Sequence, residues 1–411
     1  MQLTTVDGLP LKQALARAQR RGRRRAFLLV APLLLFILVS FVFPIGQMLF
    51  RSIHNPSFPD HMPQLTAWFK ATDQGAVPDE AAFAALAEDL RASASARTIG
   101  IVGTRVNYEM AGTRSLFTST GRKARALEPP FAKSLPAVDR KWADPDLWAA
   151  MRTASAAISP DFYIAALDRT RDNGGNIVKV APERQVYLNL FGRTLAISLG
   201  ITLICLLLGF PVAHLLATLP MRQSNLLMIL VLLPFWTSLL VRTTAWIAIL
   251  QGQGVINSVL VALGILSDDG RLAMMYNLTG TIIAMVHILL PFMILPLYSV
   301  MRAINPTYAR AARSLGATSW TTFRRIYLPQ TLPGMGAGAI LVFILAVGYY
   351  ITPALVGGAS GQLISNMIAF HMQNSLNWSL AAALATLLLA AVLLLYWLYD
   401  RLVGVDNMKL G

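Results

Sequence analysis

Acidic residues are scarce in this chain and unevenly placed. Only 20 of its 411 residues are Asp or Glu, against 35 Lys or Arg, so the formal net charge is +15 at pH 7. Of these acids, 15 lie within residues 51–185. Charged residues make up 13% of the chain and hydrophobic residues 55%, whereas a soluble domain has about 25% charged residues. The composition excludes an ordinary soluble domain and predicts a protein that crosses the membrane several times.

Motifs of catalysis and metal binding are missing as well. Cys205 is the one cysteine, so the chain can form neither an internal disulfide nor a cysteine metal cluster. No G-x-x-x-x-G-K-[ST] phosphate loop occurs, and no H-E-x-x-H, C-x-x-C or G-x-S-x-G sequence. The five histidines lack a convincing set of further ligands, and we interpret them as surface or packing residues. We therefore expect no catalytic residue, no metal site and no cofactor bound by this chain.

The first concentration of positive charge precedes an apolar run. Seven basic residues lie between Lys12 and Arg25, and the run 26–50 follows them. This run is longer than the ~7–15 residues of a signal-peptide core, and about 20 apolar residues suffice to cross a membrane. Because short basic segments stay in the cytoplasm, we expect residues 1–25 to be a cytoplasmic N-terminus and 26–50 an uncleaved first transmembrane helix. Since this placement accounts for the charge, we expect no nucleic-acid partner.

Residues 51–185 have a mixed-charge, polar composition and are predicted to form an extracytoplasmic insertion domain. Residues 79–93 read as an amphipathic helix, and 144–172 as helical with a break at 159–161. Residues 98–110 and 113–118 have the β-branched and aromatic content of strands. The insertion would serve either as a cover that docks a partner or gates the path, or as a passive elaboration.

Five more apolar runs predict an all-α membrane protein with six transmembrane helices. These runs cover 191–216, 226–250 with a break at Pro234, 276–300, 335–356 and 378–402. Residues 257–266 read as a short helix at the membrane surface. Six spans place both termini, including the tail 404–411, on the cytoplasmic side, and 186–403 form a five-helix core.

The second concentration of positive charge is the loop 301–333, which contains no acid between Met301 and Thr331. Its sequence predicts a first helix that ends near Gly316, since Gly favours the left-handed conformation at a helix end. A second helix would run from Trp320 to about Tyr327, stopped by Pro329 and Pro333. One interpretation is an interfacial helix pair whose arginines reach lipid phosphates; the other is a surface for a soluble partner.

The spacing within this loop resembles a known motif. The loop contains Ala311-Ala312, then three residues, Gly316-Ala317, then eight residues, and finally Ile326-Tyr-Leu-Pro329. This pattern is similar to the EAA motif of membrane subunits of binding-protein-dependent ABC importers. One departure is that the motif's glutamate is Arg310 here. The resemblance implies the type I ABC importer permease fold and a coupling loop that contacts an ATPase. The implied coupling residues are Arg310, Ala311, Ala312, Arg313, Gly316, Ala317, Ile326, Leu328 and Pro329.

Outside the loop, 187–403 resembles the polyamine-type (spermidine/putrescine) permeases of that family. The resemblance rests on LLPFWTSLLVRTTAWIAILQGQGVIN, VHILLPFMILPLYSVM and YYITPALVGG. It implies a multi-pass protein of the bacterial inner membrane that works with an ATPase subunit dimer, a second permease subunit and a periplasmic substrate-binding protein. ATP and Mg would then be bound by the ATPase subunits. The insertion departs from the short first loop of familiar members.

A small set of residues within the spans is predicted to line the substrate path. Ionisable groups are costly inside a membrane, and broken helices tend to line transporter sites. The candidates are Trp236, Thr237, Arg242, Tyr349, Tyr350 and Thr352. The alternative for Arg242 is a structural role, in which its side chain bonds backbone carbonyls. The alternative for the tyrosines is a place in the interfacial aromatic belt.

The cargo is expected to be a polyamine or a related amine, opine or amino-acid-like solute. Polyamine permeases commonly carry an acid where this chain has Ala354, and Asp400 is the only acid inside any predicted span. A polyvalent cation favours carboxylate partners, so the second permease would supply them, or the cargo is not a polyamine. The alternative function is a self-contained secondary transporter or channel, which would favour intramembrane acids and an internal repeat.

Overall fold

The computed structural model describes residues 11–172 and 174–403, which are mostly helical. Among them the only strands are β1 (Arg169–Arg171) and β2 (Ile177–Lys179), which pair antiparallel. Six helical segments are long and apolar enough to cross a membrane, which confirms the predicted six-span, all-α fold. They are Gln19–Arg51, Tyr187–Thr218, Leu239–Ala262, Leu278–Ala303, Ser319–Gly348 and Trp378–Arg401. The predicted tail 404–411 and the first ten residues of the predicted N-terminus lie outside the described residues.

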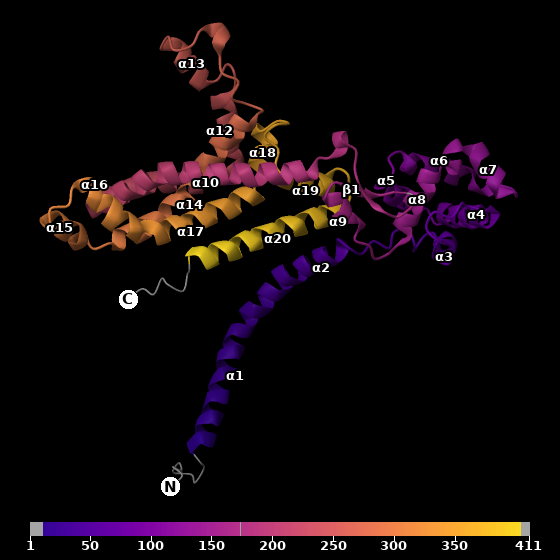
Figure 1. Cartoon of the computed structure of the whole chain (residues 1–411), viewed down its shortest axis with the longest axis horizontal. Coiled ribbons are helices and arrows are strands. Elements are labelled where there is room, and N and C mark those ends of the chain that lie inside the picture. The colour runs from indigo at the N-terminus through magenta and orange to yellow at the C-terminus, as the bar shows by residue number, and fades with distance from the viewer. Residues whose placement is uncertain (1–10, 173, 404–411) are drawn as a thin grey trace.

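The first span bends away from the other helices. It consists of α1 (Leu11–Ile37), a π-helical segment (Leu38–Val42) and α2 (Phe43–Arg51). π-turns and proline are common causes of helix bends, and Pro44 is the second residue of α2, in the turn after the π-helical segment. In Figure 1, α2 lies beside α20 while α1 leaves the bundle. None of the residues in the most apolar part of this span is buried.

Four long helices form the bundle: α10 (Tyr187–Thr218), α14 (Leu278–Ala303), α17 (Leu328–Gly348) and α20 (Trp378–Val403). They run alongside one another in Figure 1. Met293 of α14 packs between two glycines, Gly209 of α10 and Gly338 of α17. A Cβ added at Gly209 would lie 3.0 Å from the Met293 Cγ, and a Cβ added at Gly338 would lie 2.7 Å from the Met293 Sδ. Small residues at these crossings let the backbones approach closely.

The third span is interrupted, as the sequence predicted. The helix α11 (Met221–Leu232) is followed by a 3-10 turn (Leu233–Trp236) and then by α12 (Leu239–Leu250). The predicted surface helix is α13 (Val255–Ala262). In Figure 1, α12 and α13 stand away from the bundle, which α12 meets at α14 and α18 (Ile351–Val356). The last short helix, α19 (Ile364–Gln373), packs against α20.

The insertion is a bundle of short helices with its own hydrophobic core. They are α3 (Pro63–Ala71), α4 (Glu80–Ser95), α5 (Ile99–Asn107), α6 (Thr113–Lys123), α7 (Phe131–Val138), α8 (Pro145–Ser155) and α9 (Asp161–Ala166). The strands predicted for 98–110 and 113–118 are wrong, because these residues form α5 and α6. Val102 and Val106 are both buried at helical spacing, so tertiary packing overrides their β preference. The break predicted at 159–161 separates α8 from α9.

The chain leaves and re-enters the membrane helices at neighbouring points. The backbone N–H of Asn55 donates to the carbonyl of Ala157 at 2.8 Å, and His54 forms an isolated bridge with Ile158. The core formed by residues 58–154 is therefore inserted between two adjacent points, and a short linker would suffice to join them.

The last part of the insertion packs on the membrane helices. The helix α9 contacts α20, and the hydroxyl groups of Ser52 and Tyr163 are 2.7 Å apart. The Asp168 carboxylate accepts hydrogen bonds from the backbone N–H groups of Val186, Tyr187 and Leu188. Because the first N–H groups of a helix lack intrahelical partners, Asp168 caps the long helix α10.

The basic loop is built from α15 (Pro306–Ser314), α16 (Ser319–Thr322) and a π-helical segment (Phe323–Tyr327) that continues into α17. The prediction that Pro329 and Pro333 stop the second helix is therefore wrong. Pro329 lies in the first turn of α17, where a missing N–H costs little, and Pro333 is accommodated inside that helix. Figure 1 places α15 and α16 at the end of the bundle opposite the insertion.

Candidate functional site

The turn between α15 and α16 has the geometry that its sequence predicts. Asn305 caps α15 by accepting a hydrogen bond from the N–H of Thr307 at 2.9 Å. Gly316 follows α15 with φ +88°, a conformation that costs a residue with a Cβ more than it costs glycine. Thr318 caps α16 by accepting from the N–H of Thr321 at 3.2 Å. A Cβ built on Gly316 would meet nothing within 4 Å, so the backbone conformation and not crowding within this chain favours glycine.

Most of the predicted coupling residues of α15 and the turn lie on the surface. Arg310, Ala311, Arg313 and Gly316 are exposed, while Ala312 and Ala317 are half-buried. Three large apolar residues of the same loop are also exposed, which the sequence analysis did not predict. Exposed apolar groups gathered in one place indicate a contact surface. Tyr308 is 58% exposed, Leu315 89% and Trp320 68%. Sequence reasoning missed these three residues, although large apolar residues within a basic loop were a visible signal.

The loop is tied to the bundle through the C-terminal end of α10. The Tyr327 hydroxyl and His214 Nδ1 are 2.9 Å apart, and the rings of Phe323 and Phe210 pack edge to face. The guanidinium of Arg302, at the end of α14, donates to the Ala217 carbonyl at 2.7 Å. A displacement of the loop would therefore be transmitted to α10 and α14. The remaining motif residues begin α17 or precede it: Ile326 and Leu328 are half-buried and Pro329 is exposed.

Arg242 lies within a polar cluster at the junction of α12, α14 and α17. Its Nε is buried and, among the described residues, has no hydrogen-bond partner. It is close enough to interact electrostatically with His287 and Tyr349. Trp246, one helical turn along from Arg242, donates from Nε1 to His287 Nδ1 at 3.1 Å. Sequence reasoning missed His287 and Trp246, although a spacing of four puts Trp246 and Arg242 on one face of a helix.

Trp236 and Thr237 lie apart from this cluster. They occupy the break between α11 and α12, where Trp236 is 72% exposed and the Thr237 hydroxyl donates to the Pro234 carbonyl at 3.0 Å. The α12 helix stands away from the bundle, so these side chains face outward from this chain. They are available to a neighbouring subunit.

The helix is broken between α17 and α18 at Tyr349 and Tyr350, inside the predicted span 335–356. Pro353 removes the N–H that would bond the Tyr349 carbonyl, and the Ser365 hydroxyl donates to that carbonyl instead, at 2.6 Å. The Tyr350 carbonyl accepts from Asn366 Nδ2 at 2.8 Å. Side chains of α19 thus bond both carbonyls of the break. Thr352 is fully buried, and within the described chain its hydroxyl has no hydrogen-bond partner.

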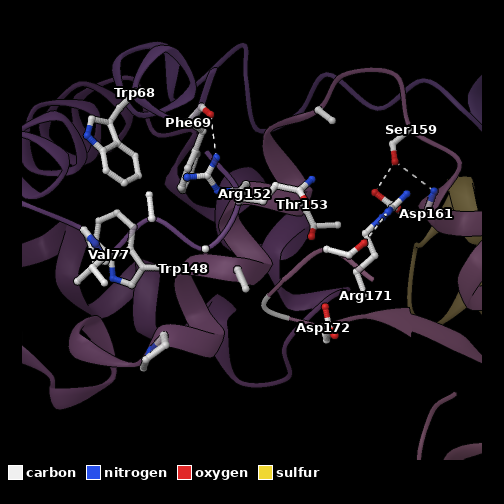
Figure 2. Close-up of a pocket in the computed structure, with 18 residues that line it drawn as sticks. Trp68, Phe69, Val77, Trp148, Arg152, Thr153, Ser159, Asp161, Arg171 and Asp172 are labelled. Carbon is white, nitrogen blue, oxygen red and sulfur yellow. Dashed lines mark hydrogen bonds and ion pairs between the residues drawn. The ribbon is translucent and has the colours of Figure 1, made fainter. Parts of the chain in front are cut away.

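A separate pocket of about 330 Å³ lies in the insertion. Figure 2 shows Trp68, Val77 and Trp148 on one side of it, with Asp161 and Arg171 on the other. The charged groups on that second side bond one another, since Arg171 Nε donates to Asp161 Oδ1 at 2.7 Å.

Arg152, between the two sides of the pocket, is also engaged. Its guanidinium donates to the carbonyls of Phe69 and Thr72 and lies 4.9 Å from the centre of the Phe69 ring. Burial lowers the pKa of this guanidinium. The bonds of Arg152 join α8 to α3, and the ion pair of Arg171 joins β1 to α9.

Comparison with known proteins identifies relatives of the membrane part. Residues 206–404 match the family described as "Binding-protein-dependent transport system inner membrane component". The chain is 38% identical over 222 residues to "Spermidine/putrescine transport system permease protein PotB" of Escherichia coli (strain K12), covering 53% of this chain and 80% of that protein. It is 34% identical over 256 residues to the protein of the same name from Haemophilus influenzae, covering 60% of this chain and 89% of that protein.

Among solved structures, the chain is similar to a chain of the "Crystal structure of bacterial alginate ABC transporter in complex with alginate pentasaccharide-bound periplasmic protein". The sequence identity is 16% and the TM-score 0.48, over 72% of this chain and 99% of that chain.

Proposed function

The chain belongs to the family of binding-protein-dependent transport system inner membrane components, and on that premise we propose how this ABC importer permease couples ATP hydrolysis to solute movement. It is a transport permease and not an enzyme. The path would lie between this chain and a second permease subunit. We assign the exposed faces of α1 and α12 to that second subunit, because this chain leaves both helices largely uncovered.

The observation that carries the coupling role is the combination of features in the loop 301–333. It presents exposed Tyr308, Leu315 and Trp320 amid arginines, at the end of the bundle opposite the insertion. The same loop is bonded to α10 and α14 through Tyr327 and Arg302. Such an element can receive a push from a soluble subunit and pass it to the spans.

We place the site of ATP hydrolysis on a separate ATPase subunit dimer that binds ATP and Mg. The absence of a phosphate loop from the sequence supports this. Both termini and the loop 301–333 would then face the cytoplasm, where short arginine-rich loops are retained. The insertion would face the opposite side, where a periplasmic substrate-binding protein delivers the solute.

We propose a polyamine or a related amine, opine or amino-acid-like compound as the solute. The names of the relatives support a polyamine. In the described part of the spans, the one acid is Asp400 at the end of α20, so the second permease would supply carboxylates for a polyvalent cation. Uptake of labelled spermidine by the reconstituted importer tests this, and uptake unaffected by excess unlabelled polyamines would exclude that solute class.

The coupling surface is tested by Leu315→Asp. An aspartate at this exposed apolar position should weaken association with the ATPase dimer about tenfold, the loss expected when a charge replaces an interface anchor. Val77→Asp is the matched control, because Val77 is 84% exposed but lies in the insertion. Co-purification of the ATPase measures both, and an ATPase that binds the Leu315→Asp chain as it binds the control would overturn the assignment.

A further inference from the structure

A basic cavity lies where the first and sixth spans meet the insertion. Its volume is about 660 Å³. The helix α2 ends at Arg51 and α20 begins at Trp378, and both residues line the cavity. The insertion closes it from the other side: the Tyr108 hydroxyl donates to the Leu376 carbonyl at 3.0 Å, and Asn55 Nδ2 donates to the Ser379 hydroxyl at 3.2 Å.

The cavity concentrates positive charge from four separate elements. Arg51 comes from α2, Arg97 from the turn after α4, and Arg105 and Arg114 from α5 and α6. None of the residues that line the cavity is acidic. Arg51, Arg97 and Arg114 are exposed and make no ion pair within the described chain. Arginines held near one another without counter-charges repel, and an anion between them removes that cost.

The buried arginine is only partly satisfied. Arg105 is 2% exposed, and its Nη1 donates to Glu109 Oε1 at 2.7 Å. In the part of the chain that the structure describes, its Nε has no hydrogen-bond partner. A buried donor without an acceptor is costly. This atom is shielded from the cavity, so the exposed arginines are the groups that can bind a ligand there. Guanidinium groups match phosphate oxygens in geometry.

An apolar groove adjoins the cavity and identifies the kind of phosphate compound. The groove has a volume of about 160 Å³ and runs between α2 and α20, lined by Pro44, Met48, Met372 and Ala381. Arg51 and Trp378 line both the groove and the cavity. Because Pro44 and Met48 precede Arg51 on the span, the groove extends along the spans from the basic cavity. Tryptophan is typical of the level at which lipid headgroups lie.

We propose that the cavity and the groove together bind one anionic phospholipid from the leaflet on the insertion's side. Its phosphate lies among Arg51, Arg97 and Arg114, and an acyl chain follows the groove between α2 and α20. A free phosphate compound would use the cavity alone and leave the adjoining groove without a role. The lipid would join the first span, which otherwise contacts little of the bundle, to the insertion and the sixth span.

The test compares lipid retention by the full-length chain. The chain is purified in detergent, exposed to phosphatidylglycerol or to phosphatidylcholine with the same acyl chains, and examined by native mass spectrometry. The double variant Arg97→Gln, Arg114→Gln should retain phosphatidylglycerol about tenfold less, since it loses two charge-assisted contacts. The variant Arg51→Gln tests the same site from a different element. The control Arg122→Gln, Arg125→Gln removes equal charge from exposed arginines that do not line the cavity and should retain the lipid fully.

Two further measurements distinguish a lipid from a soluble phosphate compound. Inorganic phosphate and glycerol phosphate are added as competitors at the concentration of the lipid, and a lipid site should release little phosphatidylglycerol to either. Equal competition by these soluble compounds would overturn the lipid assignment. Retention of both lipids to the same extent, or an unchanged phosphatidylglycerol signal in the arginine variants, would overturn it too.

Discussion

Arg310 is the residue at which the coupling loop departs from the motif that it otherwise matches. Its side chain is exposed, and within the described chain it makes no ion pair. Together with Arg313, Arg324 and Arg325 it gives the loop a positive surface without an acid. A partner that binds this surface is therefore expected to be acidic or neutral there, since complementary charge steers association.

The variant Arg310→Glu tests the sign of that partner surface. We expect it to weaken association with the ATPase about threefold, the range of an exposed ion pair, and to reduce the salt dependence of binding. Arg222→Glu is the control, because Arg222 is exposed at the start of α11 and outside the motif. Stronger association of the Arg310→Glu chain would contradict the expected complementarity.

Arg242 is the intramembrane residue whose role is most sharply testable. Because its buried Nε bonds nothing within the described chain, its replacement by Gln should not lower the midpoint of thermal unfolding. Uptake should fall about tenfold if the side chain contacts the solute, as when a charge-assisted hydrogen bond is lost. Arg193→Gln is the control, because Arg193 is an exposed arginine near the start of α10. A destabilised Arg242→Gln chain with normal uptake per folded molecule would indicate a structural role.

At the scale of elements, the helical insertion is joined to the spans at Asn55 and Ala157. The helix α9 and Asp168 belong with the permease helices by their contacts, because Asp168 caps α10. A deletion that spares them can therefore separate the role of the insertion from the folding of the spans.

The deletion variant replaces residues 56–155 with a short flexible linker. The six spans should still fold, because each span satisfies its own backbone hydrogen bonds. If the insertion docks the binding protein, loaded binding protein should no longer stimulate ATP hydrolysis by the complex, while basal hydrolysis continues. Full stimulation of the deletion complex would exclude docking. As a control, a larger deletion of residues 56–172 also removes Asp168 and should therefore destabilise α10.

A buried carboxyl makes the stability of the insertion depend on pH. Asp89 is 2% exposed and accepts hydrogen bonds from the backbone N–H groups of Gln64 and Leu65. Burial outweighs these bonds and raises the pKa of Asp89 from its usual 3.8 to about 6. The folded state therefore binds the proton more tightly than the unfolded state. The stabilisation that the protonated Asp89 gives to the folded state is therefore present in full below about pH 4. It is lost as the pH rises through about 6.

The free energy of unfolding of the insertion should accordingly fall by about 1 kcal/mol between about pH 5 and about pH 7. Hydrogen exchange of α3 and α4 in the full-length chain measures this change. The variant Asp89→Asn cannot ionise and keeps an acceptor for α3, so its profile should be flatter. A parallel pH dependence in the parent chain and the variant would show that Asp89 is not the group responsible.

The sequence was sufficient to predict elements whose signal is local. The length of the apolar runs predicted six spans, and a glycine between two capped segments predicted the turn at Gly316, which has φ +88°. The secondary structure of the insertion was partly missed, because Val102 and Val106 favour strands locally and are held in a helix by packing from distant residues. Pro333 was mistaken for a helix stop because its accommodation inside α17 depends on the surrounding bundle.

The candidate site was predicted only where its residues are neighbours in sequence. The coupling residues form one continuous loop, so their spacing alone brought them together. The cluster of Arg242, Trp246 and His287 joins helices that are far apart in the chain, and no spacing rule connects α12 with α14. Likewise the bond between Ser365 and the Tyr349 carbonyl depends on how α19 packs, which periodicity does not specify.

At the scale of the whole molecule, the insertion and the coupling loop lie at opposite ends of the long helices α10, α14 and α17 (Figure 1). The loop is bonded to α10 and α14, and the insertion caps α10 through Asp168. The same helix α10 thus connects the surface proposed for the ATPase with the surface proposed for the binding protein. Movement of α10 is the simplest mechanical link between ATP hydrolysis and access to the solute path.

The coupling of uptake to ATP hydrolysis in the reconstituted importer, with Gly316→Asp in this chain, tests the central claim most directly. An aspartate at φ +88° strains the turn and adds a negative charge to the contact surface, so the ratio of solute imported to ATP hydrolysed should fall about tenfold, the scale of a strain of 1–2 kcal/mol. Gly264→Asp is the matched control, because Gly264 also has a positive φ with open space around it but follows α13. We expect the control to transport normally and the Gly316→Asp importer to hydrolyse ATP with about one tenth of the normal uptake per ATP. Uptake per ATP equal in the two variants would contradict the role of this loop in coupling.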